Sequence, residues 1–447
     1  MPTFDDFLTK QQARFMDELA TFVAQPSIAA TGQGITEMAA LVQQRLEQLG
    51  AAVQQIPTGG APIIYAELGD GPRTLLIYNH YDVQPPDPIA QWTTPPFVPS
   101  VRDGKFYARG VSDNKGDLVC RLQAIETWQK TIGPLPLKIK WVIEGEEEIG
   151  SPHLPAFAQE HAARLQADGC LWETGGKNEN DQVMLTLGLK GIQYLELRVR
   201  SGQRDLHSGY AAIAPSAVWR LVWALNTLKD QNDEILIDHY YDHIRAPGDA
   251  ELAMLKALPF DEEKRKAALG IDRFINDEHG LDVLKRLHYG PTVTICGLQA
   301  GYTGEGMKTV LPNLAFAKID CRLVPDLTPE LCIALLRAHL DRRGFTDIEV
   351  VPLNGEHPAS SSATASIVTA CQTAVQQVYG HAPVMIPLSA GSGPMYPLTT
   401  ALNIPTVMAG VTYPASRAHA PDENIRLDDY FEGIHFIRHL IETFART

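Results

Sequence analysis

Histidines and carboxylates follow several apolar, strand-like stretches of this chain, and others lie in two polar loops. The stretches are "TLLIYNHYD", "KIKWVIEGEEEIGS" and "GCLWETGG", and the loops are "YARGVSDNKGD" and "VTYPASRAHAPDEN". Their candidate metal ligands are His80, Asp82, Asp113, Glu144, Glu146, Glu147, Glu148, Glu173 and His419. Imidazole nitrogen with carboxylate oxygen, and no cysteine nearby, is typical of catalytic zinc, with manganese and cobalt as alternatives.

Each of these residues alone has a more ordinary interpretation. A histidine such as His80 or His419 often forms hydrogen bonds in a loop, Asp113 could cap the helix expected from Lys115, and an acidic run is usually solvated. Taken together, converging carboxylates would raise one another's pKa and oppose folding unless a cation held them. We therefore expect a divalent metal site, in which Asp82 holds the second imidazole nitrogen of His80.

The elements that must position these residues alternate between strands and helices. Strand-like "RTLLIY" and "LPLKIKWVIEG" flank helical "GDLVCRLQAIETWQK", and the same alternation returns near the C-terminus with "ASIVTACQTAVQQVYG", "IPTVMAGV" and "RLDDYFEGIHFIRHLIETFA". This order predicts an α/β domain with a mostly parallel sheet. Ligands of such sheets bind beyond the carboxyl ends of the strands, where the polar residues lie.

The middle of the chain has a different pattern. Apart from a charged helical insertion, its order is β-α-β-β-α-β, from "GIQYLELRVRS" to "DIEVVPL", which predicts a ferredoxin-like α+β sandwich. We therefore expect a catalytic, metal-binding domain formed by residues 1–187 and 358–447, interrupted by a sandwich domain at residues 188–357.

Composition excludes several classes of protein. The chain has 447 residues and a formal net charge of -15, which argues against binding to nucleic acid. Its N-terminus lacks the pattern of a secretion signal, and no apolar run reaches the ~18 to 20 residues that span a bilayer, so no membrane is expected. The six cysteines are scattered, which favours a reduced, cytoplasmic location.

Five motifs in order resemble the cocatalytic zinc peptidases that include carnosinase, cytosolic nonspecific dipeptidase, glutamate carboxypeptidase, aminoacylase and succinyl-diaminopimelate desuccinylase. The motifs are "NHYDVQP", "GVSDNKG", "EGEEEIGS", "DLHSGY" and "RAHAPDEN". Each motif alone is weak, but the ordered set spans residues 75 to 425 of a β/α chain with an inserted sandwich domain. The family implies a catalytic domain and a second domain that forms a dimer and a lid.

The resemblance also implies the metal centre and the general base. Two zinc ions per subunit would share Asp113, with Glu148 and His419 completing one site and His80 and Glu173 the other. Glu147 would take a proton from a water that bridges the metals. The family also implies a cis peptide bond between Asp113 and Asn114.

The remaining implied roles concern the substrate. In a homodimer, His207 of "DLHSGY" would reach the partner's active site and stabilise the oxyanion, although His207 alone would be interpreted as a turn residue. Arg322 would receive the substrate carboxylate. The pocket would be lined by Thr309 of "KTVLP" and by Ser392 and Gly393 of "SAGSGP".

Two positions depart from the common family pattern, one at the metal centre and one at the substrate pocket. Glu173 stands where many relatives have aspartate, and "LSAGSGP" lacks the Arg-Glu pair that helps nonspecific dipeptidases recognise a free amine. We therefore expect a dipeptidase or carboxypeptidase acting on small peptides, with an N-acyl-amino-acid amidohydrolase of the aminoacylase or desuccinylase type as the alternative. A catalytically silent scaffold is disfavoured by the presence of Glu147, and a phosphoesterase by the absence of a basic clamp around these motifs.

Overall fold

The computed structural model describes residues 2–447 and divides into two compact units. The larger unit comprises Met1–Gly188, Ser360–Pro387 and Pro394–Thr447, and the smaller comprises Leu189–Ala359 and Leu388–Gly393. The short segment 388–393, which the predicted division leaves in the larger domain, belongs by its contacts to the smaller unit. The reason is that the Ser392 hydroxyl donates to the carbonyl oxygen of Gly191 and accepts from Arg322.

An eight-stranded, mostly parallel sheet forms the centre of the larger unit. Its strand order is β1-β2-β6-β3-β7-β18-β8-β17. Parallel pairs join β3 (Thr74–His80) to β6 (Lys138–Glu144) and to β7 (Gly169–Trp172), and β7 to β18 (Thr406–Met408). The other strands are β1 (Ala52–Ile56), β2 (Ile63–Leu68), β8 (Met184–Thr186) and β17 (Val384–Ile386). The carboxyl ends of β3, β6 and β7 therefore meet at one edge.

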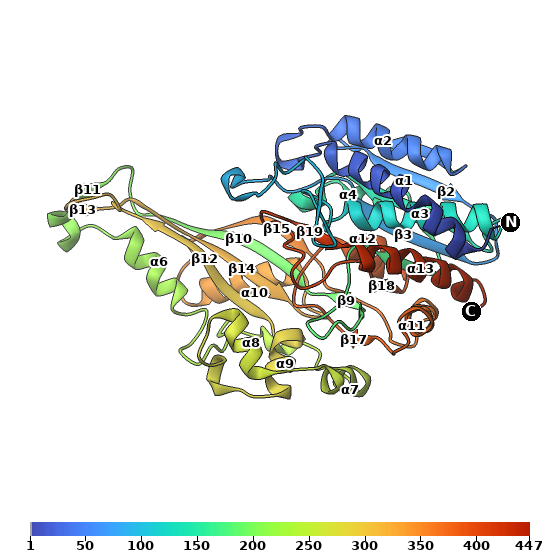
Figure 1. Ribbon diagram of the computed structural model, residues 1–447. Coiled ribbons are helices and arrows are strands. Elements are labelled where there is room, and N and C mark those ends of the chain that lie inside the picture. Colours follow the sequence, from blue (N-terminus) through green and yellow to red (C-terminus); the bar gives the residue numbers. More distant parts are fainter. Residues whose placement is uncertain (1) are drawn as a thin grey trace. The chain divides into compact units, whose positions relative to one another are not determined.

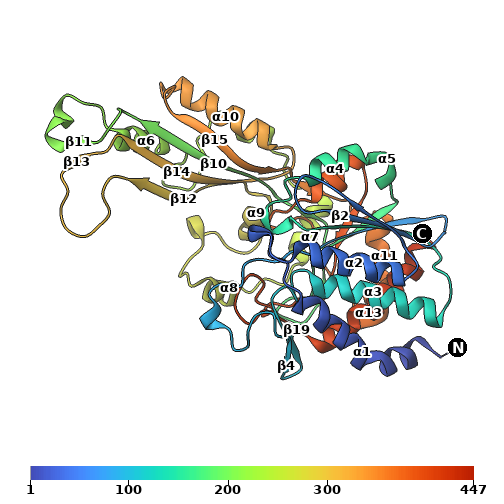
Figure 2. The same ribbon diagram turned by 90° about the horizontal axis from the view of Figure 1, so that it is seen from above.

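Helices cover both faces of this sheet, which is why its central strands are continuous apolar runs. Figure 2 shows α4 and α5 on one side of the strands and α1, α2, α3 and α13 on the other. Their bounds are α1 (Phe4–Ala24), α2 (Ile35–Gln48), α3 (Lys115–Thr131), α4 (Leu154–Glu160), α5 (Ala162–Leu165) and α13 (Leu427–Phe444). The predicted α/β class is confirmed.

A four-stranded antiparallel sheet forms the smaller unit (Figure 1), in the order β12-β14-β10-β15. Its strands are β10 (Gly191–Arg200), β12 (Thr292–Ala300), β14 (Leu314–Leu323) and β15 (Glu349–Glu356). Helices α6 (Ala217–Leu225) and α10 (Pro329–Arg342) pack on it in one apolar core. This is the β-α-β-β-α-β order that the sequence predicts. The charged insertion forms α7 (Asp249–Ala257), α8 (Glu262–Leu269) and α9 (Leu281–Tyr289).

Most of the cysteines are buried free thiols, as expected for residues that fill a core. They are Cys120, Cys170, Cys321, Cys332 and Cys371, whereas Cys296 is exposed. Among residues 2–447, no helix is both long enough and apolar enough to cross a membrane.

The buried side chain of Arg121, on α3, ties together the strand ends that carry the polar residues. Its guanidinium donates to the backbone carbonyls of Tyr78 and Trp172 at 2.9 and 2.8 Å. It also donates to the carbonyls of Glu173 and Ala409, both at 3.0 Å. Arg121 therefore donates to carbonyl groups near the carboxyl ends of β3, β7 and β18.

Replacing Arg121 with methionine should lower the free energy of unfolding by about 3 to 5 kcal/mol, because several buried carbonyl groups would lose their donor at once. The quantity to measure is the midpoint of urea denaturation. Lys130→Met, at an exposed position of the same helix, serves as the control and should leave the midpoint within experimental error. Equal stability of the two variants would contradict this role for Arg121.

Candidate metal centre

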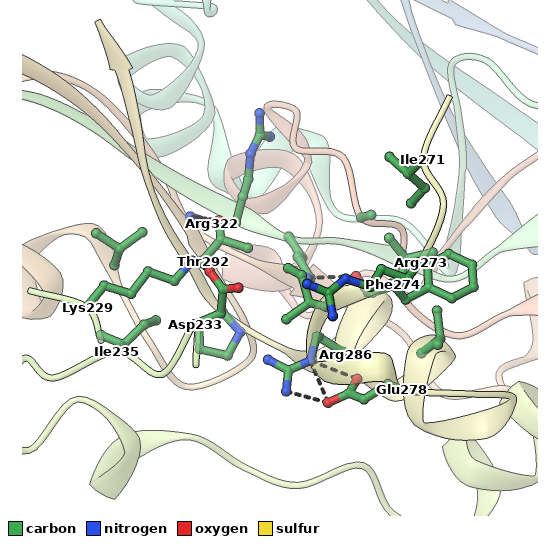
Figure 3. A pocket seen from close by; sticks show the side chains of 17 residues that line it. Lys229, Asp233, Ile235, Ile271, Arg273, Phe274, Glu278, Arg286, Thr292 and Arg322 are labelled. Carbon is green, nitrogen blue, oxygen red and sulfur yellow. Dashed lines mark hydrogen bonds and ion pairs between the residues drawn. The ribbon is translucent and has the colours of Figure 1, made fainter. Parts of the chain in front are cut away.

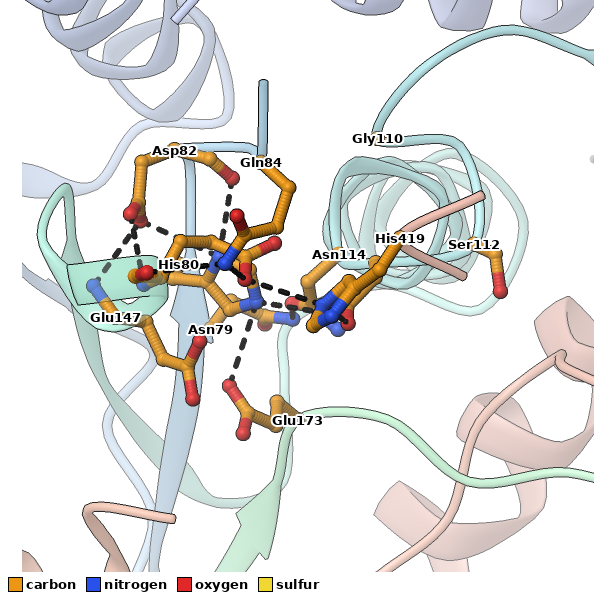
Figure 4. A network of polar contacts seen from close by, with 12 residues as sticks. Asn79, His80, Asp82, Gln84, Gly110, Ser112, Asn114, Glu147, Glu173 and His419 are labelled. Carbon is orange, nitrogen blue, oxygen red and sulfur yellow. Dashed lines mark hydrogen bonds and ion pairs between the residues drawn. The ribbon is translucent and has the colours of Figure 1, made fainter. Parts of the chain in front are cut away.

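The polar cluster includes His80, Glu173 and His419 (Figure 4), and each carboxylate oxygen of Asp113 faces one of its two imidazoles. The Nε2 atom of His80 is 3.0 Å from Oδ1, and the Nε2 atom of His419 is 3.1 Å from Oδ2. The cap residue of α3 is Asn114, whose side chain makes no capping hydrogen bond, so Asp113 is not the helix cap of the ordinary interpretation. The peptide bond between Asp113 and Asn114 is cis, as expected.

Glu148 joins this cluster from the turn that follows β6. Its Oε2 atom is 3.1 Å from Nε2 of His419 and accepts a hydrogen bond from Gln84 at 2.9 Å. Ligand atoms of His80, Asp113 and Glu148 lie within 4.8 Å of one another, close enough to share a metal ion. Three separate segments of the chain therefore converge on one point.

Glu173, directly after β7, brings a further buried carboxylate to His80. Its Oε2 atom is 3.7 Å from Nε2 of His80, and its Oε1 atom accepts from the indole of Trp172 at 3.1 Å. Burial raises the pKa of Glu173 to about 8. Oε2 is buried without a hydrogen-bond partner among residues 2–447. A divalent cation would satisfy this oxygen, so the donor set fits a metal.

The carboxyl group of Glu147 lies in the same cluster of acidic side chains. Burial, followed by the charge of Glu173, raises its pKa well above the ordinary value. The carboxyl group therefore holds a proton readily, which is the property required of a group that shuttles protons.

Asp82 connects His80 to the turn that carries Glu147 and Glu148. Its carboxylate accepts the backbone N–H groups of Glu147 at 3.3 Å and of Glu148 at 3.0 Å. The Nδ1 atom of His80 lies 3.3 Å from the same carboxylate and 3.1 Å from the backbone carbonyl of Asp82. Asp82 thus fixes the imidazole and the acidic turn relative to one another.

The two histidines offset the negative charge of the cluster by holding protons. Hydrogen bonds that His419 donates to Asp113 and Glu148 raise its pKa to about 10. Burial disfavours the charged form of His80, but its contacts with Asp113 and Asp82 prevail and raise its pKa well above the usual value. Conversely, burial of Asp113 is outweighed by both histidines, and its pKa lies below the usual range. Positive charge at this position, whether from protons or from a cation, therefore stabilises the cluster of carboxylates.

The sequence analysis missed Glu423, which holds the loop of Asp113 in place. Its carboxylate accepts the backbone N–H groups of Gly110, Ser112 and Asp113 at 2.8 to 3.0 Å. It also accepts a hydrogen bond from Arg109 at 2.6 Å. A signal was available, because Glu423 lies in "RAHAPDEN", the motif that supplies His419.

The other predicted site residues lie in the smaller unit. His207 is exposed in β11 (Leu206–His207), which pairs with β13 (Val310–Leu311) beside the exposed Thr309. Arg322, on β14, donates to the Ser392 hydroxyl at 2.8 Å, and Gly393 follows Ser392. These five residues therefore form two groups within the smaller unit, one around His207 and one around Arg322.

Comparisons with known proteins agree with this geometry. The sequence matches peptidase family M20/M25/M40 over residues 76–443. The Beta-Ala-His dipeptidase of Mus musculus is 28% identical over 462 residues, covering 96% of this chain and 92% of that protein. The Cys-Gly metallodipeptidase dug1 of Schizosaccharomyces pombe is also 28% identical, covering 96% of this chain and 95% of that protein.

Among solved structures, an M20 family metallo-carboxypeptidase, Sso-CP2 from Sulfolobus solfataricus, is 37% identical with a TM-score of 0.92, covering 97% of this chain and 99% of that one. The family match covers most of the chain, and it includes the polar residues gathered at the strand ends. The chain therefore belongs to peptidase family M20/M25/M40, and it is a metal-dependent peptidase.

Proposed function

We propose that this chain hydrolyses the amide bonds of small peptides as a dipeptidase or carboxypeptidase. The observation that carries the proposal is Asp113, whose two oxygens each face an imidazole inside a buried cluster of carboxylates. The similar mouse protein is named as a dipeptidase and the similar Sulfolobus protein as a metallo-carboxypeptidase, which supports this class of substrate.

We assign two divalent ions to each subunit, zinc in the first place, with manganese and cobalt as alternatives. Asp113 would be shared, Glu148 and His419 would hold one ion, and His80 and Glu173 would hold the other. The unpartnered Oε2 atom of Glu173 supports its place in this set. Bound ions of this kind polarise a carbonyl group and make water more acidic.

Glu147 is assigned as the general base. Its carboxylate would take a proton from the attacking water and pass it to the nitrogen of the leaving amine. The carboxylate of Asp82 accepts the backbone N–H of Glu147, and this hydrogen bond fixes the position of Glu147 relative to His80. Glu147 would therefore act as the base, and Asp82 of the same subunit would position it.

The smaller unit is assigned to substrate binding and to a homodimer. Arg322 would hold the substrate carboxylate, beside Ser392 and Gly393, because a guanidinium matches a carboxylate in shape and charge. The Nδ1 atom of His207 accepts the N–H of Gly209 at 3.0 Å, so Nε2 carries the proton of the neutral ring and can donate to an oxyanion. In the dimer, His207 and Thr309 would serve the partner's site. The unpaired thiols favour a cytoplasmic enzyme.

The second candidate is an N-acyl-amino-acid amidohydrolase. It is favoured by "LSAGSGP", which lacks the Arg-Glu pair associated with recognition of a free amine. Both candidates use the same metal centre. Purified protein, supplied with zinc or manganese, should be assayed against dipeptides and N-acyl amino acids; hydrolysis of acyl substrates alone would select the second candidate, and no hydrolysis of either class would contradict both.

Glu147→Gln should retain its metal but lose activity by about 10²- to 10⁴-fold, because an amide cannot accept the proton of water. Glu148→Gln should instead lose metal first, because it weakens a ligand. Metal content by atomic emission and turnover, measured on both variants, check these outcomes. If Glu147→Gln lost its metal and Glu148→Gln kept metal but lost activity, Glu148 would be the base and Glu147 the ligand.

Metal binding should release protons and weaken as pH falls. The raised pKa values of His419, about 10, and Glu173, about 8, mean that both groups hold protons near neutral pH in the metal-free protein, and a ligand must give up its proton. Calorimetric titration of metal-free protein in buffers of different ionisation enthalpy measures the release. His419→Ala should release fewer protons; uptake of metal at pH 7 without proton release would contradict the assignment.

Activity should depend on a histidine supplied by the partner subunit. His207→Ala should reduce turnover by about 10²- to 10³-fold while metal content is retained, because it removes a donor and no ligand. Mixing this variant with Glu147→Gln should restore activity, since each mixed dimer contains one site with neither change. Mixed dimers that form and remain inactive would show that His207 does not act across the subunits.

A further inference from the structure

The indole of Trp172 donates a hydrogen bond to the carboxylate of the next residue in the chain, Glu173. Its Nε1 atom lies 3.1 Å from Oε1 of Glu173. Successive side chains of a strand point to opposite faces of the sheet, but β7 ends at Trp172 and the chain bends at Glu173. This bend allows two neighbouring side chains to meet at one of the proposed metal ligands.

The two carboxylate oxygens of Glu173 have different surroundings. Oε1 accepts from Trp172, whereas Oε2 is buried without a hydrogen-bond partner among residues 2–447 and lies 3.7 Å from Nε2 of His80 (Figure 4). Glu278, in the smaller unit, has the more usual arrangement (Figure 3), because both of its oxygens accept hydrogen bonds from Arg286, at 2.9 and 2.8 Å. The indole therefore engages one oxygen of Glu173 and leaves the other next to the imidazole.

The side chain of Trp172 is itself held in one position. It is fully buried, and Tyr78 stacks on it with ring centroids 3.8 Å apart and an angle of 13° between the ring planes. The hydroxyl of Tyr78 donates to Glu144 at 2.6 Å, and the same oxygen of Glu144 accepts from Ser151 at 2.9 Å. A side chain fixed by packing and hydrogen bonds can orient a neighbouring group precisely.

The main chain of Trp172 and Glu173 is fixed as well, because Arg121 donates to both of their carbonyl oxygens. The remaining freedom of Glu173 therefore lies in its long, flexible side chain. Ordering such a side chain costs conformational entropy when a ligand binds. A hydrogen bond that orders the carboxylate before the ligand arrives reduces this cost and so increases affinity.

We propose that Trp172 is a positioning residue of the metal centre, whose N–H holds Oε1 of Glu173 so that Oε2 alone is presented to the cation beside His80. This assignment rests on the proposed function, in which Glu173 and His80 hold the same ion. Hydrogen bonds of this kind to metal ligands typically raise metal affinity about 10- to 100-fold.

A simpler interpretation is that a buried indole uses the nearest acceptor for its N–H group. The hydrogen bond would then contribute to the stability of the fold and not to metal binding. The two interpretations differ in a measurable quantity, because only the proposed role makes metal affinity depend on the N–H group of Trp172.

The first test measures zinc affinity by competition with a chelator, starting from the metal-free full chain. Trp172→Phe removes the N–H group and keeps a buried aromatic ring beside Tyr78, so one zinc ion should bind about 10- to 100-fold more weakly while the other is unaffected. Trp141→Phe is the matched control. Trp141 is a buried residue of β6 whose N–H donates to Asn79 at 3.1 Å, and Asn79 keeps its hydrogen bond from Arg121. This control should leave both zinc affinities unchanged.

Unchanged zinc affinity in a folded Trp172→Phe variant would overturn the proposal. An equal loss of affinity in both phenylalanine variants would also overturn it, because a general loss of packing would then explain the result. Urea denaturation of both variants, followed by circular dichroism, establishes that each is folded under the conditions of the titration.

The second test needs no variant and decides the matter even if Trp172→Phe does not fold. A crystal structure of the zinc-loaded full chain should show zinc on Oε2 of Glu173 and the indole N–H still on Oε1. Zinc bonded to Oε1, or to both oxygens, in an enzyme that hydrolyses amides would refute the role of Trp172 and leave the proposed function standing. The expected arrangement in a protein that hydrolyses no amide would refute the proposed reaction and retain the role of Trp172.

Discussion

The crowding of carboxylates at the carboxyl ends of parallel strands is the constraint on which the larger unit depends. Asp113, Glu147, Glu148 and Glu173 come from different segments but meet around two imidazoles. Such a group of negative charges opposes folding unless protons or cations neutralise it. Burial raises the pKa values of Glu147 and Glu173, and the charges of neighbouring acids raise them further. Protonated histidines offset it in part, and a bound divalent cation would offset it further.

Much of the surrounding polar structure holds this unfavourable arrangement in place. Arg121 ties three strand ends together, and Glu423 holds the loop that presents Asp113. Glu423 is itself buried, and burial raises its pKa to about 6 despite the ion pair with Arg109. The hydrogen bonds of Arg121 and Glu423 offset the free energy cost of burying their charges. Precise placement of catalytic side chains requires such support.

The two units are assigned different parts of the proposed chemistry. The larger unit brings together the groups proposed to bind metal and to move a proton. The smaller unit contains Arg322 and His207, which are proposed to contact the substrate. The charged insertion that forms α7 to α9 belongs to this smaller unit.

Sequence alone determined the fold class and the candidate metal ligands. The alternation of apolar strands and helices indicated the parallel sheet, and the ordered motifs identified the residues from His80 to His419, because such signals are local along the chain. Only the tertiary structure decided which atoms meet: Arg121 is an ordinary helix arginine in the sequence, yet it contacts carbonyls up to 288 positions away. Likewise, nothing local relates Lys190 to the end of α9, where the carbonyl groups of Leu287 and Gly290 accept hydrogen bonds from its ammonium group. Those contacts arise from chain folding, which joins segments by burial and hydrogen bonding and not by sequence proximity.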